Sequence, residues 1–501
     1  MKIIFFYIGT PTPIFETELE LIRKHEKLGD SVRVIQCTGN LPNCHWNLNH
    51  RNSKCALCCS KFKNGWDILN PGGNVELKTF PSNTRMDPAL PLEFDSVDDI
   101  NMYQHDKENI GFGVTASLVS ILRDHRFDTK KHYAEVNHTL STAIQVYDTL
   151  KHEIEGFGPD KVFFFNGRIA THLPAKLLCK KLGIEYCSYE VSRKKNCYRL
   201  FDNKTAHDVI THEEVNQFQL SWRPENEIIG KTILQQMRAG GPLEKTRVYT
   251  QDQRKGVLPE GFNPNKRNIA IFTGTIDEYA GIENAKNKIY KPDETAGVCR
   301  ILESFEFDSD YFFYLRVHPH MKEVPSTIAQ LTDIRRLSTE FNNVHVIWPE
   351  EIIDSYALMD ACEKIVTFGS TVGIEATYWG KPSVLADHAT FENFNYAYKP
   401  DNHDELVKLL KDNLTPLPAD LALKVVFLMS FDDGIPYKYF KDIGIKNELA
   451  IGTFDSVEIK SDMLPTLWHW IDIFPSRLLR VFMKPSLIFK KLKESIKTLQ
   501  G

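Results

Sequence analysis

The chain has 501 residues, of which 42% are hydrophobic, and a formal net charge of −5; this length predicts two large domains plus a tail instead of one compact core. The balance of 61 Lys and Arg against 66 Asp and Glu argues against a nucleic-acid partner, and the cysteines are too sparse for a disulfide scaffold. The apolar N-terminal segment is too short for a signal peptide, and no uncharged apolar run approaches the roughly 18 residues of a membrane span, so we expect a cytoplasmic protein.

The first predicted elements alternate between strand and helix. Residues 2–8 are a short apolar run typical of a buried strand, residues 14–28 have helical periodicity that ends at a Gly-Asp pair, and residues 31–36 return as a strand. A strand–helix–strand unit of this kind predicts a parallel sheet. Residues 37–99, rich in Cys, Asn, Pro and Gly, are expected to form a long irregular insertion.

The alternation continues along the rest of the chain. We expect helices at 114–124 and 133–154, followed by a strand at 161–166, a helix at 171–182 and a strand at 185–191. The polar stretch 251–267, which contains Pro and Gly, is interpreted as an interdomain linker. A second series then has strands at 268–274, 311–317, 344–347, 364–367 and 383–386, with helices near 296–305, 353–361 and 372–378.

The predicted fold class is α/β of the GT-B type, with two Rossmann-like, doubly wound domains that face one another across a cleft. We place the N-terminal domain at residues 1–262, with the cysteine-rich insertion at 37–99 inside it, and the second domain at 263–450. Residues 451–501 form a C-terminal tail. Ligands of such sheets bind at the carboxyl ends of the strands, so the functional residues are sought there.

The most informative stretch is VTFGSTVGIEATYWGKP at residues 366–382. A buried strand ends and the chain turns through Gly369, Ser370 and Thr371 into a helix, whose free N–H groups and positive dipole end suit a phosphate or diphosphate. Glu375 lies one turn into that helix and is placed to accept both hydroxyls of a ribose. The alternative is an ordinary capped helix with a solvated glutamate.

A second stretch, YLRVHPH at residues 314–320, also ends a buried strand. Pro319 cannot continue a strand ladder and turns the chain out of the sheet. Arg316 and His318 are two residues apart and share one strand face, where this pair suits a phosphate or the carbonyl of a nucleobase. On its own, a histidine at such a position is more often structural.

Together with FTGT at 272–275, these stretches resemble the donor domain of bacterial capsule and surface-polysaccharide glycosyltransferases, a group that includes capsule Kdo transferases and GT-B sialyltransferases. The resemblance implies that an HP element and a Ser/Thr-rich turn containing a glutamate bind the donor nucleotide, and that residues 263–450 are the nucleotide-sugar donor domain. The GKP at residues 380–382 matches the GKP that follows this turn in the group. The expected donor-binding residues are Thr273, Gly274, Arg316, His318, Pro319, Gly369, Ser370, Thr371 and Glu375.

The first domain carries a further part of the resemblance. FFFNGRIATHLPAKLLCKKLGIEYCSYE at residues 163–190 resembles the NGR segment of the same proteins. Asn166, Gly167 and Arg168 close a strand and open a helix, so we expect them at the cleft on the acceptor side. The alternative for Arg168 is a surface residue paired at the start of a helix.

Transfer with inversion needs a general base that deprotonates the acceptor hydroxyl, and the first domain is expected to supply it. The candidates are Glu190, which ends a strand, and His105 and Asp106, which precede a helix in a polar stretch. We rank Glu190 first, although each of the three is also explained as a solvated or capping residue. We expect no catalytic metal for this transfer.

The insertion contains CTGNLPNCHWNLNHRNSKCALCC. Its C-x2-C pair is typical of half of a tetrahedral zinc site, and a long loop with little core would gain stability from a structural zinc ion. Free thiols and an iron–sulfur cluster are the alternatives. The expected ligands are Cys37, Cys44, Cys55 and Cys58, with Cys59, His45 and His50 as spare candidates.

Residues 476–501 hold seven Lys or Arg and one Glu, with apolar residues at spacings that give a stripe on a helix. A basic amphipathic segment of this kind predicts binding to a membrane surface, here the inner face of the cytoplasmic membrane. The alternative is a helix that packs back across the two domains.

The sequence thus predicts a glycosyltransferase that moves a sugar from a nucleotide-activated donor to a growing surface or capsular glycan, with a lipid-linked or oligosaccharide acceptor. The HP element favours a CMP-sugar because the Kdo and sialic acid transferases of the resembling group use one, while UDP- and GDP-sugars remain open. Three alternatives remain: a CDP-glycerol-type polyol-phosphate transferase, a non-catalytic nucleotide-sugar-binding component of an assembly complex, and an epimerase.

Overall fold

The structure, a computed structural model, describes residues 1–9, 11–81, 91–192, 194–241, 250, 252–276, 280, 282, 289–430, 434–442 and 452–460. The chain divides into two compact units. The first unit comprises residues 1–85 and 437–501, and the second comprises residues 86–436.

The first unit begins with three parallel strands in the order β1 (Lys2–Tyr7), β2 (Ser31–Gln36) and β3 (Val75–Thr79). Helix α1 (Ile14–Lys27) connects β1 to β2, and helix α2 (Asn52–Leu69) connects β2 to β3. Strand β1 is buried along nearly its whole length because its two faces are both covered, as its continuous apolar run predicts. The predicted strand–helix–strand start and its parallel pairing are confirmed.

The segment 37–99 is more regular than expected. It contains α2, β3 and the short helix α3 (Val97–Asn101). Helix α2 packs closely on α1, because a side chain at Gly65 would bring its Cβ within 2.5 Å of the Phe15 ring. Helix α2 was not predicted from the sequence, because its buried positions Phe62, Gly65 and Leu69 give only a narrow apolar stripe. Its cysteines also suggested metal ligands in place of a helix.

The C-terminal part of the first unit adds three short antiparallel strands, β13 (Phe440–Asp442), β14 (Gly452–Phe454) and β15 (Val457–Glu458). One buried carboxylate on α1 holds this segment. Glu20, only 3% exposed, accepts the N–H groups of Lys438, Tyr439 and Phe440 at 2.7, 2.8 and 3.0 Å. Burial raises the pKa of Glu20, although the three N–H groups act in the opposite direction.

We expect the substitution Glu20→Gln to lower the free energy of unfolding by about 1–3 kcal/mol, because an amide nitrogen cannot accept the N–H groups that the second carboxylate oxygen binds. Urea unfolding measures the change. The control Glu155→Gln alters an exposed glutamate of helix α5 (Tyr133–Phe157) and should stay within about 0.5 kcal/mol of the wild type. Equal effects of the two substitutions would contradict the anchoring role of Glu20.

The second unit begins with α3, α4 (Gly111–Leu122) and α5, followed by strands β4 (Lys161–Phe165), β5 (Glu185–Val191) and β6 (Cys197–Asp202). Helix α6 (Leu173–Leu182) connects β4 to β5, which pair in parallel. Strand β6, which the sequence analysis did not predict, pairs antiparallel with β5 and with the two-residue strand β12 (Ile435–Pro436).

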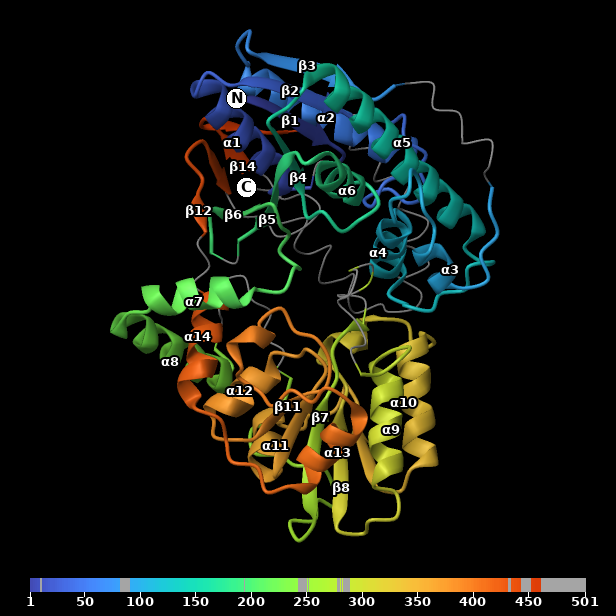
Figure 1. Ribbon diagram of the computed structural model, residues 1–501, viewed down its shortest axis with the longest axis vertical. Helices are drawn as coiled ribbons and strands as arrows, with labels where there is room; N and C mark the ends of the chain where they lie inside the picture. Colours follow the sequence, from blue (N-terminus) through green and yellow to red (C-terminus); the bar gives the residue numbers. More distant parts are fainter. Residues whose placement is uncertain are drawn as a thin grey trace, which may run out of the picture. The chain divides into compact units, whose positions relative to one another are not determined.

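The same unit contains a fully parallel five-stranded sheet in the order β11-β10-β7-β8-β9. Alternate residues of its central strand enter two separate cores. Ile269 and Ile271 pack with α9 (Glu294–Ser304), α10 (Ala329–Glu340) and α13 (His403–Lys411), while Ala270 and Phe272 pack with α11 (Ser355–Ala361) (Figure 1). The strands are β7 (Arg267–Phe272), β8 (Tyr311–Arg316), β9 (Val344–Ile347), β10 (Lys364–Thr367) and β11 (Ser383–Leu385). The predicted α/β fold class with doubly wound parallel sheets is confirmed.

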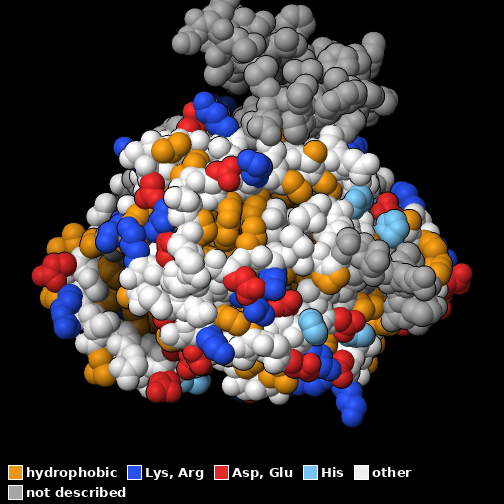
Figure 2. Space-filling view, turned by 90° about the horizontal axis from the view of Figure 1, so that it is seen from above, with side chains coloured by type: hydrophobic (Ala, Val, Ile, Leu, Met, Phe, Trp, Pro, Cys, Tyr) orange, Lys and Arg blue, Asp and Glu red, His pale blue; other side chains and the backbone are white. Residues whose placement is uncertain are grey.

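Two helices that the sequence analysis left unassigned, α7 (His212–Ser221) and α8 (Pro224–Ala239), pack on α14 (Ala419–Ser430). Their shared apolar core also includes residues of α12 (Val372–Tyr378) and β11. No helix among the described residues is long and apolar enough to cross a membrane. On the face drawn in Figure 2, lysines and arginines alternate with acidic side chains.

Candidate functional site

The strand order of the five-stranded sheet places a ligand-binding position between β7 and β10. From β7 the chain continues to β8 and β9 on one side and then crosses to β10 and β11 on the other. The crevice where the direction changes is where parallel sheets of this kind bind ligands. Gly274, just after β7, lies beside the end of β10, since an added Cβ there would be 3.6 Å from the carbonyl oxygen of Phe368.

The loop after β8 meets the same place. The hydroxyl of Thr273 accepts the backbone N–H of His318 at 3.1 Å. The predicted donor-site stretches that follow β7, β8 and β10 therefore come together at one edge of the sheet, although 42 residues separate Gly274 from Arg316 in the sequence. The geometry unites FTGT, RVHP and the turn at 369–371, as the resemblance implied.

Helices α9 and α10 fix the loop after β7. The N–H of Gly274 donates to Glu294 Oε2 at 3.1 Å, and Gln330 Nε2 donates to the Gly274 carbonyl oxygen at 3.1 Å and to Glu294 Oε1. Beside these residues Thr275 is 2% exposed, and its buried hydroxyl has no hydrogen-bond partner among the described residues. A buried hydroxyl without a partner at this edge is available to a bound ligand.

Arg316 and His318 have different surroundings. Arg316 is 2% exposed, its Nη1 donates to the carbonyl oxygen of Trp348 at 3.0 Å, and burial lowers its pKa to about 10. His318 begins the 3-10 helix η2 (Pro319–Glu323), and its Nδ1 accepts the N–H of His320 at 3.2 Å. That bond leaves the ring proton of a neutral His318 on Nε2.

In the turn into α12 and the helix after it, Glu375 is more buried than the sequence alone suggested. Ser370 Oγ accepts the N–H of Val372 at 3.4 Å, and the Thr371 side chain is exposed. Glu375, however, is only 7% exposed, and its Oε2 accepts the hydroxyl of Tyr356 from α11. Burial raises the pKa of Glu375 to about 7, so it is not the solvated glutamate of the alternative interpretation. Oε1 remains to accept a ligand hydroxyl.

A second group of predicted residues gathers at the ends of β4 and β5. Asn166 has a left-handed backbone with φ +60°, and its Oδ1 accepts the N–H of Arg168 at 3.1 Å. Its Nδ2 donates to Glu190 Oε1 at 2.6 Å and to His207 Nε2 at 3.0 Å. Asn166, Arg168 and Glu190 were predicted from the sequence, but His207 was not, because a histidine in a polar loop after an unpredicted strand carries no local signal.

The environment of Glu190 suits proton transfer near neutral pH. Burial raises the pKa of Glu190 to about 7, against the lowering effects of Asn166, Arg168 and Arg199. The residue as a whole is partly exposed, although its carboxylate is buried. A carboxylate whose pKa is near the working pH is well matched to a general base.

Asp106 and His105 have other partners. Asp106 Oδ2 is 2.9 Å from Lys181 and 3.0 Å from both Lys151 and the Tyr147 hydroxyl, and these groups hold its pKa well below the usual range. His105 Nε2 is 2.7 Å from Asp148 Oδ1. A carboxylate with a strongly lowered pKa is a poor proton acceptor at neutral pH, so among the three candidates the geometry favours Glu190.

Four cysteines of the insertion lie near one another, while the fifth has another neighbour. Burial, together with the nearby Cys37 and Cys55, raises the pKa of Cys44 to about 12 and that of Cys59 to about 11, whereas Cys58 Sγ lies 4.0 Å from the Tyr7 hydroxyl. Within the described residues, which include all five of these cysteines, His45 and His50, no three potential ligands are arranged to hold a metal ion. Structural zinc stays a prediction, which metal analysis of the purified chain tests.

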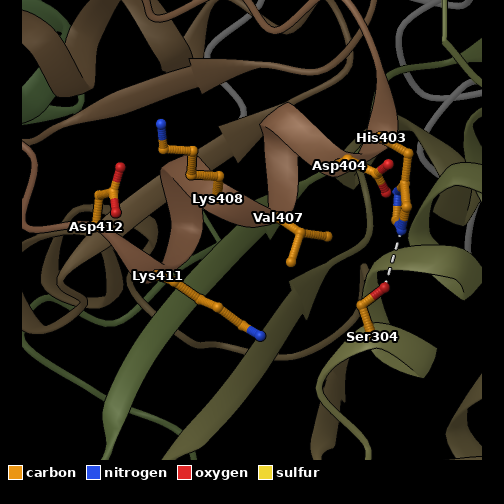
Figure 3. A pocket seen from close by; sticks show the side chains of 7 residues that line it. All are labelled: Ser304, His403, Asp404, Val407, Lys408, Lys411 and Asp412. Atoms are coloured by element: carbon orange, nitrogen blue, oxygen red, sulfur yellow. Dashed lines mark hydrogen bonds between the residues drawn. The ribbon is translucent and has the colours of Figure 1, made fainter.

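The cavity drawn in Figure 3 lies elsewhere. It has a volume of about 580 Å³ and is lined by residues of α13 and by Ser304, whose hydroxyl is 2.9 Å from His403 Nε2. Ser304 is the last residue of α9, while Glu294 at the start of the same helix contacts the loop after β7. The cavity is therefore at the opposite end of α9 from the strand carboxyl ends.

No protein-family model and no curated protein matches the chain. Solved structures similar to it include a KpsC beta Kdo 2,4 transferase from Thermosulfurimonas dismutans, at 13% identity and a TM-score of 0.32, covering 54% of this chain and 79% of that one. A UDP-GlcNAc 2-epimerase from Neisseria meningitidis bound to UDP-GlcNAc is similar at 13% identity and a TM-score of 0.25, covering 85% and 98%. The glycotransferase of kitacinnamycin has 14% identity and a TM-score of 0.24, covering 85% and 94%.

A Kdo transferase is thus among the similar structures. Similarity at this level carries no information about the reaction, so the residues of the two groups described above must supply it.

Gly167 is required by the group of residues at the ends of β4 and β5. It has φ +79°, and an added Cβ would lie 2.8 Å from both the Phe164 ring and Thr205 Cγ2. We expect Gly167→Ala to lower the free energy of unfolding by about 1–2 kcal/mol from the left-handed backbone and by about 1–3 kcal/mol more from overpacking. Urea unfolding measures the sum.

Gly183→Ala is the matched control, because Gly183 has a similar φ of +67° but open space around the missing Cβ. Only the backbone contribution should appear in the control. If the two variants lower the free energy of unfolding by the same amount, the close packing of Phe164 and Thr205 around Gly167 does not contribute to stability.

Proposed function

We propose that this chain is a glycosyltransferase that moves a sugar from a nucleotide-activated donor to a hydroxyl of a glycan acceptor. The observation that carries the proposal is the meeting of Gly274, His318 and the 369–371 turn at the switch point of the five-stranded sheet. A nucleotide is the ligand that such a position fits, since backbone N–H groups and hydroxyls there can receive phosphate oxygens.

In the proposed donor site, His318 Nε2 and the hydroxyls of Thr275 and Ser370 donate to the phosphate, and Glu375 Oε1 accepts a ribose hydroxyl. Tyr356 supports this role because its hydroxyl holds the other oxygen of Glu375 and so fixes the carboxylate. The donor is proposed to be a CMP-sugar, on the HP element that His318 and Pro319 form.

In the proposed reaction, Glu190 takes the proton of the acceptor hydroxyl while that oxygen bonds to the anomeric carbon of the sugar. The bond from the anomeric carbon to the donor phosphate oxygen breaks at the same time, and the nucleotide leaves with the electron pair. Asn166 holds one oxygen of Glu190, which directs the other oxygen to the acceptor.

The acceptor is proposed to be a lipid-linked or free oligosaccharide of a surface glycan. Binding of the tail 476–501 to the membrane surface stays a prediction, because these residues lie outside the part of the chain that the structure describes.

The pH dependence tests the role of Glu190. A base must be ionised to accept a proton, so kcat at saturating donor should rise with pH, with a midpoint near 7, and become constant above it. Glu190→Gln should lower kcat by roughly 10²–10⁴-fold and remove this dependence. Asp106→Asn is the control, and its kcat–pH curve should keep the same midpoint. If Asp106→Asn instead removes the pH dependence of kcat, Asp106 and not Glu190 is the base.

Nucleotide binding tests the donor site. Calorimetry with CMP, CDP, UMP, UDP, GDP and ADP should find one preferred nucleotide, and Glu375→Gln should weaken it by about 1–3 kcal/mol through loss of a charged hydrogen bond. Because the pKa of Glu375 is about 7, the affinity of the wild type should fall as the pH drops below 7. Glu340→Gln, at the exposed end of α10, should change nothing.

The identity of the bound nucleotide separates the remaining possibilities. Preference for CMP supports the CMP-sugar donor, and preference for CDP favours the polyol-phosphate alternative. Binding of none of the six would contradict the donor site, while binding without turnover would favour a non-catalytic component.

A further inference from the structure

The loop that follows β6 brings His207 to the acceptor-side residues. This loop is held by its own bonds, since the N–H of Thr205 donates to Asp208 Oδ2 at 2.7 Å and Lys176 Nζ donates to Asp208 Oδ1 at 3.1 Å. Ser188 Oγ also donates to the carbonyl oxygen of Lys204 at 2.9 Å, which fastens the loop to β5. The position of the His207 ring is therefore set by the fold around it.

The hydrogen bonds of Asn166 determine the state of His207. Asn166 Oδ1 receives the backbone N–H of Arg168, so the amide nitrogen must be the atom that faces Glu190 and His207. Its two hydrogens are then divided between Glu190 Oε1 and His207 Nε2. Nε2 can accept only as a lone pair, so the ring is neutral with its proton on Nδ1.

The surrounding charges keep the ring in this state. Burial, Arg168 and Lys176 lower the pKa of His207 to about 4, and Asp208 opposes them. The imidazole is therefore an acceptor throughout the pH range in which Glu190 titrates. A protonated ring would instead turn the amide oxygen of Asn166 toward the Glu190 carboxylate, which repels it.

We propose that His207 is a positioning residue for Glu190: the neutral ring accepts one N–H of Asn166 and thereby holds the other N–H on the Glu190 carboxylate. The role of Glu190 as base rests on the proposed function, whereas the orientation of the Asn166 amide by His207 does not.

Substitution by a residue without an acceptor tests this inference. His207→Leu should remove one of the two bonds that orient the Asn166 amide, with the Arg168 N–H as the other, and raise the pKa of Glu190, because the bond from Asn166 that stabilises the charged carboxylate is weakened. We expect the midpoint of the kcat–pH curve to move up by roughly half to one pH unit, with kcat at neutral pH lowered several-fold and donor KM unchanged. His207→Gln, whose side-chain oxygen can accept the same N–H, should restore most of the midpoint.

The control His212→Leu makes the same exchange at an exposed position of α7 and should leave the midpoint in place. If His207→Leu does not fold, His207→Met takes its place, since a thioether is only a weak acceptor. An unchanged midpoint in a folded variant, or equal midpoints in the Gln and Leu variants, would overturn the proposal.

A readout without turnover keeps the inference separate from the proposed function. Infrared difference spectra follow the protonated carboxyl group of Glu190 during a pH titration, with Glu190→Gln to identify its band. A raised midpoint in His207→Leu without any transferase activity would retain the positioning role and remove the proposed function. A carboxyl midpoint that His207→Leu leaves unchanged would overturn the positioning role even if the enzyme is active.

Discussion

Parallel strand pairing is the constraint on which the candidate sites depend. A parallel sheet with helices on both faces sends every strand in the same direction, so the loops that follow its strands meet at one edge. In the second unit this brings residues near positions 274, 318 and 370 together. The alternation of Ile269 and Ile271 with Ala270 and Phe272 along β7 is what permits helices on both faces, and thus the parallel arrangement itself.

Buried carboxylates have three different uses in this chain. Glu20 binds three backbone N–H groups and fastens the segment 438–440 to α1. Glu375 is held by one tyrosine hydroxyl, and Glu190 by the side-chain amide of Asn166 and the backbone N–H of Val191. The last two have too few donors to offset their burial, so their pKa values rise to about 7. Because their hydrogen bonds only partly offset the effect of burial, these two carboxylates titrate near neutral pH and suit functions there.

Several features had no sequence signal that the analysis could use. The helix α2 was hidden because its thiols suggested metal ligands and its apolar stripe is narrow. Tyr356 and His207 act through partners 19 and 41 residues away in the sequence, Glu375 and Asn166. The weak candidacy of Asp106 also became visible only with Lys151 and Lys181 in place, because paired lysines lower a carboxylate pKa from a distance along the chain.

By itself, the sequence determined the α/β class, the parallel strand–helix–strand units and the bounds of several elements, because periodicity and turn residues are local properties. Strand β9, strand β10 and helix α12 have the predicted bounds. Tertiary structure alone decided which polar groups are buried and which partners they have. A carboxylate's pKa and a histidine's tautomer depend on atoms brought near by folding, and that information is not contained in the spacing of residues along the chain.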